Sequence, residues 1–352
     1  MSRLPNQTRE LAGRFDPTLG YQSRTDESTT DAILCRILAD AGPSQDKATA
    51  SATVTQRRIS RRVAITGLAA VAVAGVVVYI DGPGPGEQSA SAAATPPLLA
   101  TGAPDMPGSA AAVLGAIIDR TRSLPAGPAK SGYRHFSLDT WALTTRINNQ
   151  QVTSAVIPEH REVWIAPDGS GREVRHYLTP IFASSAAKQA WQRQGMPGSD
   201  TRTDTVTSPS FSLIWPQAAP TDPAALAKWL TRGHPVANGP AETIAAVTDL
   251  VKEQVLDPQQ RAALLRVISK LPSLTYRGPV NDRAGRPGEL FSLDSNYSGL
   301  PTRYELIVDK VDGRILGSDE VLPTTPGKLG VKIPAVIDYE TYLQADITSS
   351  NH

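Results

Sequence analysis

Ser185 and Lys188 stand three positions apart, which is the S-x-x-K spacing of penicillin-binding enzymes. In those enzymes the serine is the nucleophile, and the lysine or a nearby carboxylate activates it. The two companion motifs of that class, S-D-N and K-T-G, occur nowhere in the sequence. A pattern with only two fixed positions also arises often by chance, so we do not expect acyl-transfer chemistry at Ser185.

The histidines and the single cysteine do not form a metal-binding pattern either. No two histidines have the short spacing of paired zinc ligands, and Cys35 lies far from all of them. Residues 82–86 read G-P-G-P-G, in which proline replaces the donor amides that a phosphate-binding loop needs. We therefore predict no catalytic residue, no metal and no cofactor, and we expect that the protein is not an enzyme. The histidines are His135, His160, His176, His234 and His352.

Residues 63–80 form an uncharged, apolar run that directly follows a basic cluster. As an α-helix this run would be about 27 Å long, close to the ~30 Å hydrocarbon core of a bilayer. The arginines before the run and Asp81 after it predict a single-pass anchor in the cell membrane, with a cytoplasmic N-terminus and an extracytoplasmic C-terminal domain. The span includes Val63, Gly67, Val71, Gly75 and Ile80, and its inner flank is Arg57, Arg58, Arg61 and Arg62.

A cleaved export signal is the alternative to a retained anchor. Ser60, Arg61 and Arg62 before an apolar run resemble a twin-arginine signal, and residues 89–94 offer small residues for cleavage. However, residues 1–62 would make an unusually long leader, and the run is longer than the apolar core of most signal peptides. The retained anchor, residues 57–80 with its basic flank, is the favoured interpretation.

The cytoplasmic tail, residues 1–56, is polar apart from one short segment. In that segment Ile33, Leu34, Ile37 and Leu38 would lie on one face of a helix. A helix this short is not stable alone in water. Either the tail is largely disordered with a nascent helix, or a cytoplasmic protein partner binds its apolar face.

The charge balance argues against nucleic acid as a partner. The chain has 35 Lys and Arg residues against 34 Asp and Glu residues, a net charge of +1. Neither side of the apolar run has the concentrated basic charge that binding to a phosphate backbone requires. The only cysteine, Cys35, precedes the run, so the outer part has no disulfide framework and depends on its hydrophobic core.

Beyond the anchor, residues 81–108 have the proline, glycine and alanine content of an extended linker, and residues 109–352 form the outer domain. Strands, then helices, then strands again, joined by hairpin turns and without a βαβ rhythm, predict an α+β domain with an antiparallel sheet packed against helices. We expect helices at 109–125, 222–230, 244–251 and 257–271, and strands at 133–147, 152–166, 171–178, 274–280, 289–294, 302–309 and 314–320.

Five segments of the outer domain stand out by their turn and cap residues and by their order. They are residues 162–172, 221–226, 260–272, 282–288 and 305–317. Together with the basic-flanked anchor, they resemble an uncharacterised actinobacterial family of single-pass membrane-anchored proteins. Its members are often encoded beside extracytoplasmic-function sigma factors.

The resemblance implies a fold and a setting. The outer domain is similar to the curved half-barrel of lipoprotein carriers and of the periplasmic regulator of the envelope-stress anti-sigma factor. A role in envelope signalling follows, with a sigma factor as the cytoplasmic partner of the tail. One feature departs from this pattern, because a zinc anti-sigma domain has a histidine and a C-x-x-C motif, and residues 1–62 contain only Cys35.

Three functions stay open at this stage. We expect a membrane-anchored extracytoplasmic sensing or binding protein that regulates a sigma factor. The first alternative is a tethered carrier of a lipid or another apolar ligand, and the second is a structural envelope protein without signalling. The Phe and Trp residues of the outer domain either fill its core or line an apolar hollow between sheet and helices, as a carrier would need.

Overall fold

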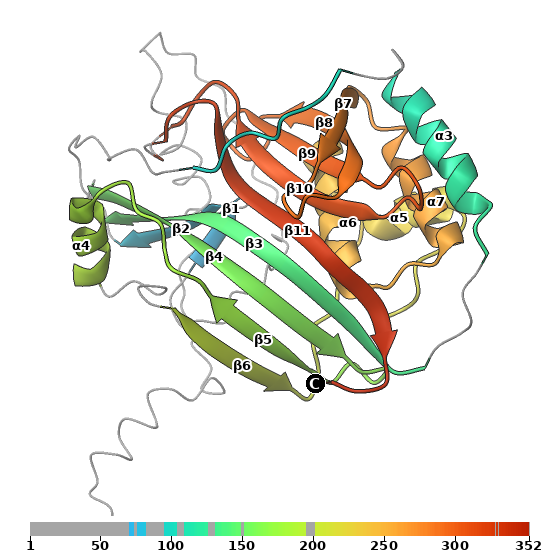
Figure 1. The fold of residues 1–352 in the computed structure, drawn as a ribbon, viewed down its shortest axis with the longest axis horizontal. Coiled ribbons are helices and arrows are strands. Elements are labelled where there is room, and N and C mark those ends of the chain that lie inside the picture. The colour runs from blue at the N-terminus through green and yellow to red at the C-terminus, as the bar shows by residue number, and fades with distance from the viewer. Residues whose placement is uncertain are drawn as a thin grey trace, which may run out of the picture.

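The computed structural model describes residues 70–73, 76–81, 95–103, 109–125, 131–148, 151–194, 201–327, 329 and 331–351. Within these residues one open sheet packs against a group of helices (Figure 1). The predicted α+β class with an antiparallel sheet is confirmed, because every pairing along the main path of the sheet is antiparallel.

The strands of this path are β3 (Tyr133–Asn148), β4 (Gln151–Ile165), β5 (Gly171–Tyr177), β6 (Arg202–Ser208), β7 (Thr275–Asn281), β8 (Pro287–Ser295), β9 (Thr302–Val308), β10 (Ile315–Leu322) and β11 (Ala335–Thr348). Their order across the sheet is β6-β5-β4-β3-β11-β10-β9-β8-β7. The sheet therefore consists of two antiparallel meanders, β3 to β6 and β7 to β11. They are joined by the pairing of β11 with β3, in which Tyr339 lies opposite Trp141.

The helices are α3 (Ala110–Arg122), α4 (Ser185–Arg193), α5 (Pro223–Leu230), α6 (Pro240–Glu253) and α7 (Pro258–Ile268), with a short 3-10 helix, η1 (Val236–Asn238). Side-chain caps begin three of the four expected helices. The hydroxyl of Ser109 and the carboxylates of Asp222 and Asp257 each accept a hydrogen bond from a backbone amide three residues on. Gln260 completes a capping box with Asp257, so these helix starts are fixed by local sequence.

Helices α3, α5, α6 and α7 cover one face of the β8–β11 half of the sheet, which we call the helix face (Figure 1). Leu138 on β3, Leu306 on β9 and Tyr342 on β11 point into the core that these helices complete with Leu250 and Leu264. Strand β10 is buried along its whole length, since the other face of the sheet is covered as well.

Part of that second cover is a segment of the predicted linker, residues 95–103, which we call the strap. The backbone amide of Gly102 donates to the carbonyl oxygen of Pro279 at 2.8 Å, and Thr101 forms an isolated bridge with β7. Leu99 packs on a buried cluster that includes Leu290. The strap therefore packs as part of the folded domain, although the sequence places it in the linker.

The strap supplies a first prediction, because two adjacent leucines in it differ in environment. Leu99 packs on the sheet, whereas Leu98 is 46% exposed. We expect Leu99→Ser to lower the free energy of unfolding by about 1 kcal/mol and to speed hydrogen exchange at the amide of Gly102. The matched variant Leu98→Ser should leave both quantities nearly unchanged. Equal effects of the two variants would show that the strap is not held by this contact.

Helix α4 and the strands β6 and β11 are among the elements that the sequence does not predict. Helix α4 is short, and of its residues only Trp191 is buried. Strand β6 is a polar edge strand whose residues alternate between exposed and half-buried. Strand β11 mixes acidic and apolar residues, and its pattern becomes clear only between its two partner strands.

Half of the predicted membrane span, 9 of its 18 residues, lies outside the described residues. Its described part forms two short strands, β1 (Ala70–Val73) and β2 (Val76–Asp81), which pair with each other, and β2 also pairs in parallel with the end of β3. These residues are extended where the sequence predicts a helix, in line with the strand preference of valine. Among the helices of the described residues, none has the length and apolar content needed to cross a bilayer. The anchor as a whole stays a prediction.

Candidate functional site

The residues singled out in the sequence lie mostly outside the described part of the chain. Val71 is in β1 and Ile80 is in β2. The remaining residues predicted for the anchor and for the partner face lie outside the described residues: Val63, Gly67, Gly75, Arg57, Arg58, Arg61, Arg62, Ile33, Leu34, Ile37 and Leu38.

Ser185 and Lys188 both lie exposed on the short helix α4. Ser185 is its first residue, directly after the capping residue Ser184. A nucleophile needs a base and a sheltered site for its substrate. The expectation that Ser185 carries out no acyl-transfer chemistry stays a prediction.

One hollow, which we call the α6 pocket, lies among α5, η1, α6 and the residues that follow α7. Its volume is about 270 Å³. Gly239, at a φ of 88°, separates η1 from α6, and Pro240 opens the helix. The glycine and the proline at the boundary between η1 and α6 therefore shape this side of the pocket. Its lining is mainly apolar with a few polar groups: Ala227, Leu230, Val236, Gly239, Pro240, Ala246, Leu271, Pro272, Thr231, Thr243, His234 and Glu242.

His234 is the buried polar centre of this pocket. Its Nδ1 lies 2.9 Å from Glu242 Oε1, its Nε2 lies 3.4 Å from Asp249 Oδ2, and its ring stacks on Trp215. Burial alone would lower the pKa of His234, but the hydrogen bonds and negative charges of Asp249 and Glu242 raise it to about 9. The imidazole is therefore positively charged at neutral pH.

A chain of polar contacts, the α6 network, runs from this pocket to the sheet. Lys252 Nζ lies 3.3 Å from Asp249 Oδ1 and 2.7 Å from Glu340 Oε1 on β11. The hydroxyl of Tyr342 donates to Glu340 Oε2 at 2.7 Å and lies 3.2 Å from the Ser318 hydroxyl on β10. Helix α6 is therefore joined to the middle of the sheet by buried polar groups.

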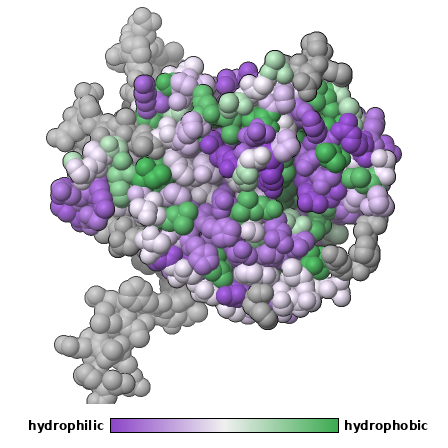
Figure 2. Space-filling view, viewed as in Figure 1, coloured by the Kyte–Doolittle hydropathy of each residue, from purple (hydrophilic) through white to green (hydrophobic). Residues whose placement is uncertain are grey.

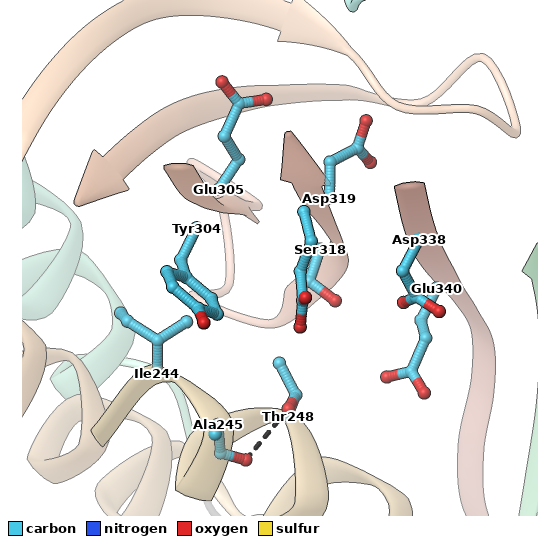
Figure 3. Close-up of a pocket in the computed structure, with 10 residues that line it drawn as sticks. Ile244, Ala245, Thr248, Tyr304, Glu305, Ser318, Asp319, Asp338 and Glu340 are labelled. Atoms are coloured by element: carbon cyan, nitrogen blue, oxygen red, sulfur yellow. Dashed lines mark hydrogen bonds between the residues drawn. The ribbon is translucent and has the colours of Figure 1, made fainter. Parts of the chain in front are cut away.

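A second, much smaller space lies where α6 meets the sheet, as Figure 3 shows. Tyr304, Asp338 and Glu340 point from the sheet toward Thr248 on α6, and the volume left between them is about 20 Å³. That volume is about enough for one water molecule. The described junction is packed rather than hollow, and Trp191, Trp215 and Phe291 are fully buried.

Glu305 and Asp319 point away from α6, toward the strap side of the sheet (Figure 3). Arg283 forms an ion pair with Asp319, and its guanidinium lies 4.2 Å from the ring centre of Tyr339. The same guanidinium lies 3.4 Å from the carbonyl oxygen of Pro97 in the strap. We call this group the strap clamp, because Arg283 holds the strap against the central strands.

The carboxyl groups behind the clamp carry shifted pKa values. Burial raises the pKa of Asp319, and the Arg283 charge only partly opposes this. Burial and the neighbouring charge of Asp319 raise the pKa of Glu305 to about 7. Glu305 therefore changes its charge near neutral pH.

A histidine and carboxylate cluster lies on β3 and β4. His135 Nε2 is 2.6 Å from Glu162 Oε2, and His160 contacts both Glu162 Oε1 at 3.2 Å and Asp139 Oδ1 at 2.7 Å. Burial opposes charge on both partners, but their hydrogen bonds raise the pKa of His160 and lower that of Glu162. The described residues contain no group of three or more side chains arranged to hold a metal ion. Two of these contacts join β3 to β4, and the contact between His160 and Glu162 lies within β4.

The face shown in Figure 2 has no single broad apolar area. Hydrophobic residues appear there as small patches separated by hydrophilic ones. Scattered apolar residues are normal on a protein surface. On this face the surface alone does not indicate a docking site, and the α6 pocket and the strap clamp are the candidate functional features.

Comparison with known proteins adds no identity. No protein-family model matches this chain, and no curated protein matches its sequence.

Proposed function

We propose that this protein is anchored in the cell membrane and that its α+β domain binds and senses a ligand outside the cell. In this proposal the tail around Ile33 and Leu38 passes the signal to a cytoplasmic partner, for which a sigma factor is the candidate. The observation that carries the proposal is the clamp between Arg283 and the strap, since it ties the segment that leads to the predicted anchor to the core of the domain.

The contacts between pocket and strap support a sensing role. The α6 network reaches Ser318 on β10, and its neighbour Asp319 holds Arg283 on the opposite face. A ligand that moved α6 would therefore act on the strand that holds the strap. Such a chain of packed and hydrogen-bonded groups is the kind of route through which two sites can be coupled.

The topology of the sheet supports the finer likeness on which the proposal draws. Two antiparallel meanders joined edge to edge, with helices on one face, are compatible with the half-barrel of lipoprotein carriers and of the envelope-stress regulator. Fold alone does not carry function, so this likeness only raises the expectation of a binding domain.

The predicted topology gives a direct test. We expect protease added to intact spheroplasts to remove an epitope at His352 and to spare one at Met1, because the anchor is retained with its N-terminus inside. Lysed spheroplasts, in which both epitopes should be lost, are the control. Release of the C-terminal domain into the medium would instead show a cleaved signal and would overturn the anchor.

The tail separates a sensor from a carrier and from a structural protein. We expect Leu34→Asp with Leu38→Asp to abolish the transcriptional response to envelope stress, while the protein level stays constant. Crosslinking through Cys35, which lies between these residues, should capture the sigma factor. An unchanged response together with no captured sigma factor would remove the signalling role.

A tethered carrier of an apolar ligand is the second candidate function, because the α6 pocket has a mainly apolar lining. A carrier would keep its function without residues 1–56, whereas a sensor would lose it. Deletion of residues 1–56 therefore decides between the carrier and the sensor.

A further inference from the structure

We infer that the α6 pocket binds a small, mainly apolar molecule that carries a hydrogen-bond donor, best a positively charged amine, and no negative charge. This inference rests on the proposed binding function and assigns its site and its ligand class. The pocket, at about 270 Å³, lies just below the common range of ~300–1,000 Å³ for ligand sites. It therefore suits a molecule smaller than a typical drug or a membrane lipid.

The lining favours an apolar body. Leu230 and Leu271 form part of the wall, and Val236 at the rim is 75% exposed. A ligand in the pocket would remove part of this apolar surface from water, which stabilises the complex in proportion to the area covered. The hydroxyl-bearing residues Thr231 and Thr243 add a small polar fraction.

The charge that a ligand meets is that of Glu242. Its side chain is 15% exposed, whereas that of His234 is 2% exposed and has its ring nitrogens directed at Glu242 and Asp249. Each oxygen of Glu242 has one partner, since Oε1 contacts His234 and Oε2 accepts from Asn238 at 3.0 Å. A carboxylate can accept about four hydrogen bonds, so acceptor capacity remains for a ligand donor.

The balance of the surrounding charges points the same way. The positive charge of His234 is shared by two carboxylates, Glu242 and Asp249, so the three groups together are negative. Lys252 contacts Asp249 on the side away from the pocket, toward Glu340. An anionic ligand would be repelled at Glu242, and rejection of such a ligand is as much a part of specificity as attraction.

A reporter of occupancy lies directly behind the pocket residue His234. Trp215 stacks on His234, with ring centres 5.6 Å apart, and on Trp229, with ring centres 5.3 Å apart. A donor bound at Glu242 would change the hydrogen bond to His234 and so the surroundings of the Trp215 ring. Tryptophan fluorescence should therefore follow binding.

The test uses the full chain in lipid nanodiscs and three probes of equal length: hexylamine, hexanol and hexanoate. We expect a saturable change in tryptophan fluorescence with hexylamine, weaker binding of hexanol, and no saturable binding of hexanoate. Glu242→Gln should weaken hexylamine binding by about ten-fold and change hexanol binding much less, because only the amine uses the charge. Retained hexanol binding also shows that the variant is folded.

A matched pair of variants separates the pocket from the lipid. Ala227 on α5 is exposed and lines the pocket, whereas Ala224 is exposed on the same helix outside the lining. We expect Ala227→Phe to abolish saturable binding and Ala224→Phe to preserve it. Equal signals from the two variants would show partition into lipid and would overturn the inference, as would tighter binding of hexanoate than of hexylamine. Neither result would touch the signalling test on the tail, so the two proposals fail separately.

Discussion

Glu305→Gln is expected to raise the free energy of unfolding by roughly 3 kcal/mol at pH 9 and to leave it nearly unchanged at pH 4. Glu305 is 8% exposed, and burial together with the charge of Asp319 raises its pKa to about 7. An unfolded glutamate has a pKa near 4.3, so the folded state favours the protonated form. The stability that this group contributes is therefore full below about pH 4.3 and is lost as the pH rises through about 7.

The measurement is denaturant unfolding of the α+β domain at several pH values, followed by tryptophan fluorescence. Asp294→Asn is the control, because this carboxylate is 62% exposed and pairs with Arg303 at the surface. It should change stability by less than about 0.5 kcal/mol at any of these pH values. A gain for Glu305→Gln that is equal at pH 4 and pH 9 would contradict the assignment.

The second large effect is expected at Trp215. Its side chain has no exposed surface, stacks on Trp229 and His234, and donates from Nε1 to the Trp229 carbonyl oxygen at 3.1 Å. Its backbone is held as well, since its amide donates to Glu253 and its carbonyl accepts from Gln254. Trp215→Ala should therefore cost about 3–5 kcal/mol, through the lost contacts and the cavity left behind.

Denaturant unfolding measures this loss of stability, and two further variants give values for comparison. Trp215→Phe keeps an aromatic ring against His234 and loses the indole donor, so it should cost clearly less than alanine. Val311→Ala, at a side chain that is 60% exposed, should stay within about 0.5 kcal/mol of the parent. A cost below about 1 kcal/mol for Trp215→Ala would mean that this core region repacks freely.

The features that the sequence predicted best are those with local causes. Asp257 and Gln260 form their capping box within one helical turn, and α7 begins where that signal lies. The turn at Asp312 and Gly313 is equally local, since Gly313 has a φ of 71°, a conformation that glycine adopts without steric cost. Hairpin turns and helix caps could therefore be read without any knowledge of the fold.

Strand β11 could not be predicted because its causes are distant in sequence. It completes the sheet between β10 and β3, and its partner residues Trp141 and Tyr339 are far apart along the chain. The carboxylate of Glu340 faces the helices, which would argue against a buried strand, and it is satisfied there by Lys252 on α6 and by the Tyr342 hydroxyl. The amino-acid pattern of β11 itself does not reveal these distant partners.

The candidate site left a weak trace in the sequence. Glu242 and Asp249 lie seven positions apart, so they share one face of α6 after two turns. His234 comes before both of them in the chain, just ahead of η1, and contacts both. Two carboxylates on a helix usually face water. The buried imidazole of His234 comes to lie between these two carboxylates only in the folded structure. For that reason His234 could not be distinguished from the other histidines as a binding residue before the fold was known.

The strap has a consequence for how copies of this protein could meet on a crowded surface. An unpaired strand edge invites pairing with another chain. The β7 edge is occupied by the Thr101 bridge and weakened as a template by Pro279, which lacks an amide hydrogen. Along the main path of the sheet, β6 is then the end that stays open, since it pairs only with β5 among the described residues. A fibre that grows by edge pairing along this path needs both ends open, so a second copy paired at β6 would end the growth.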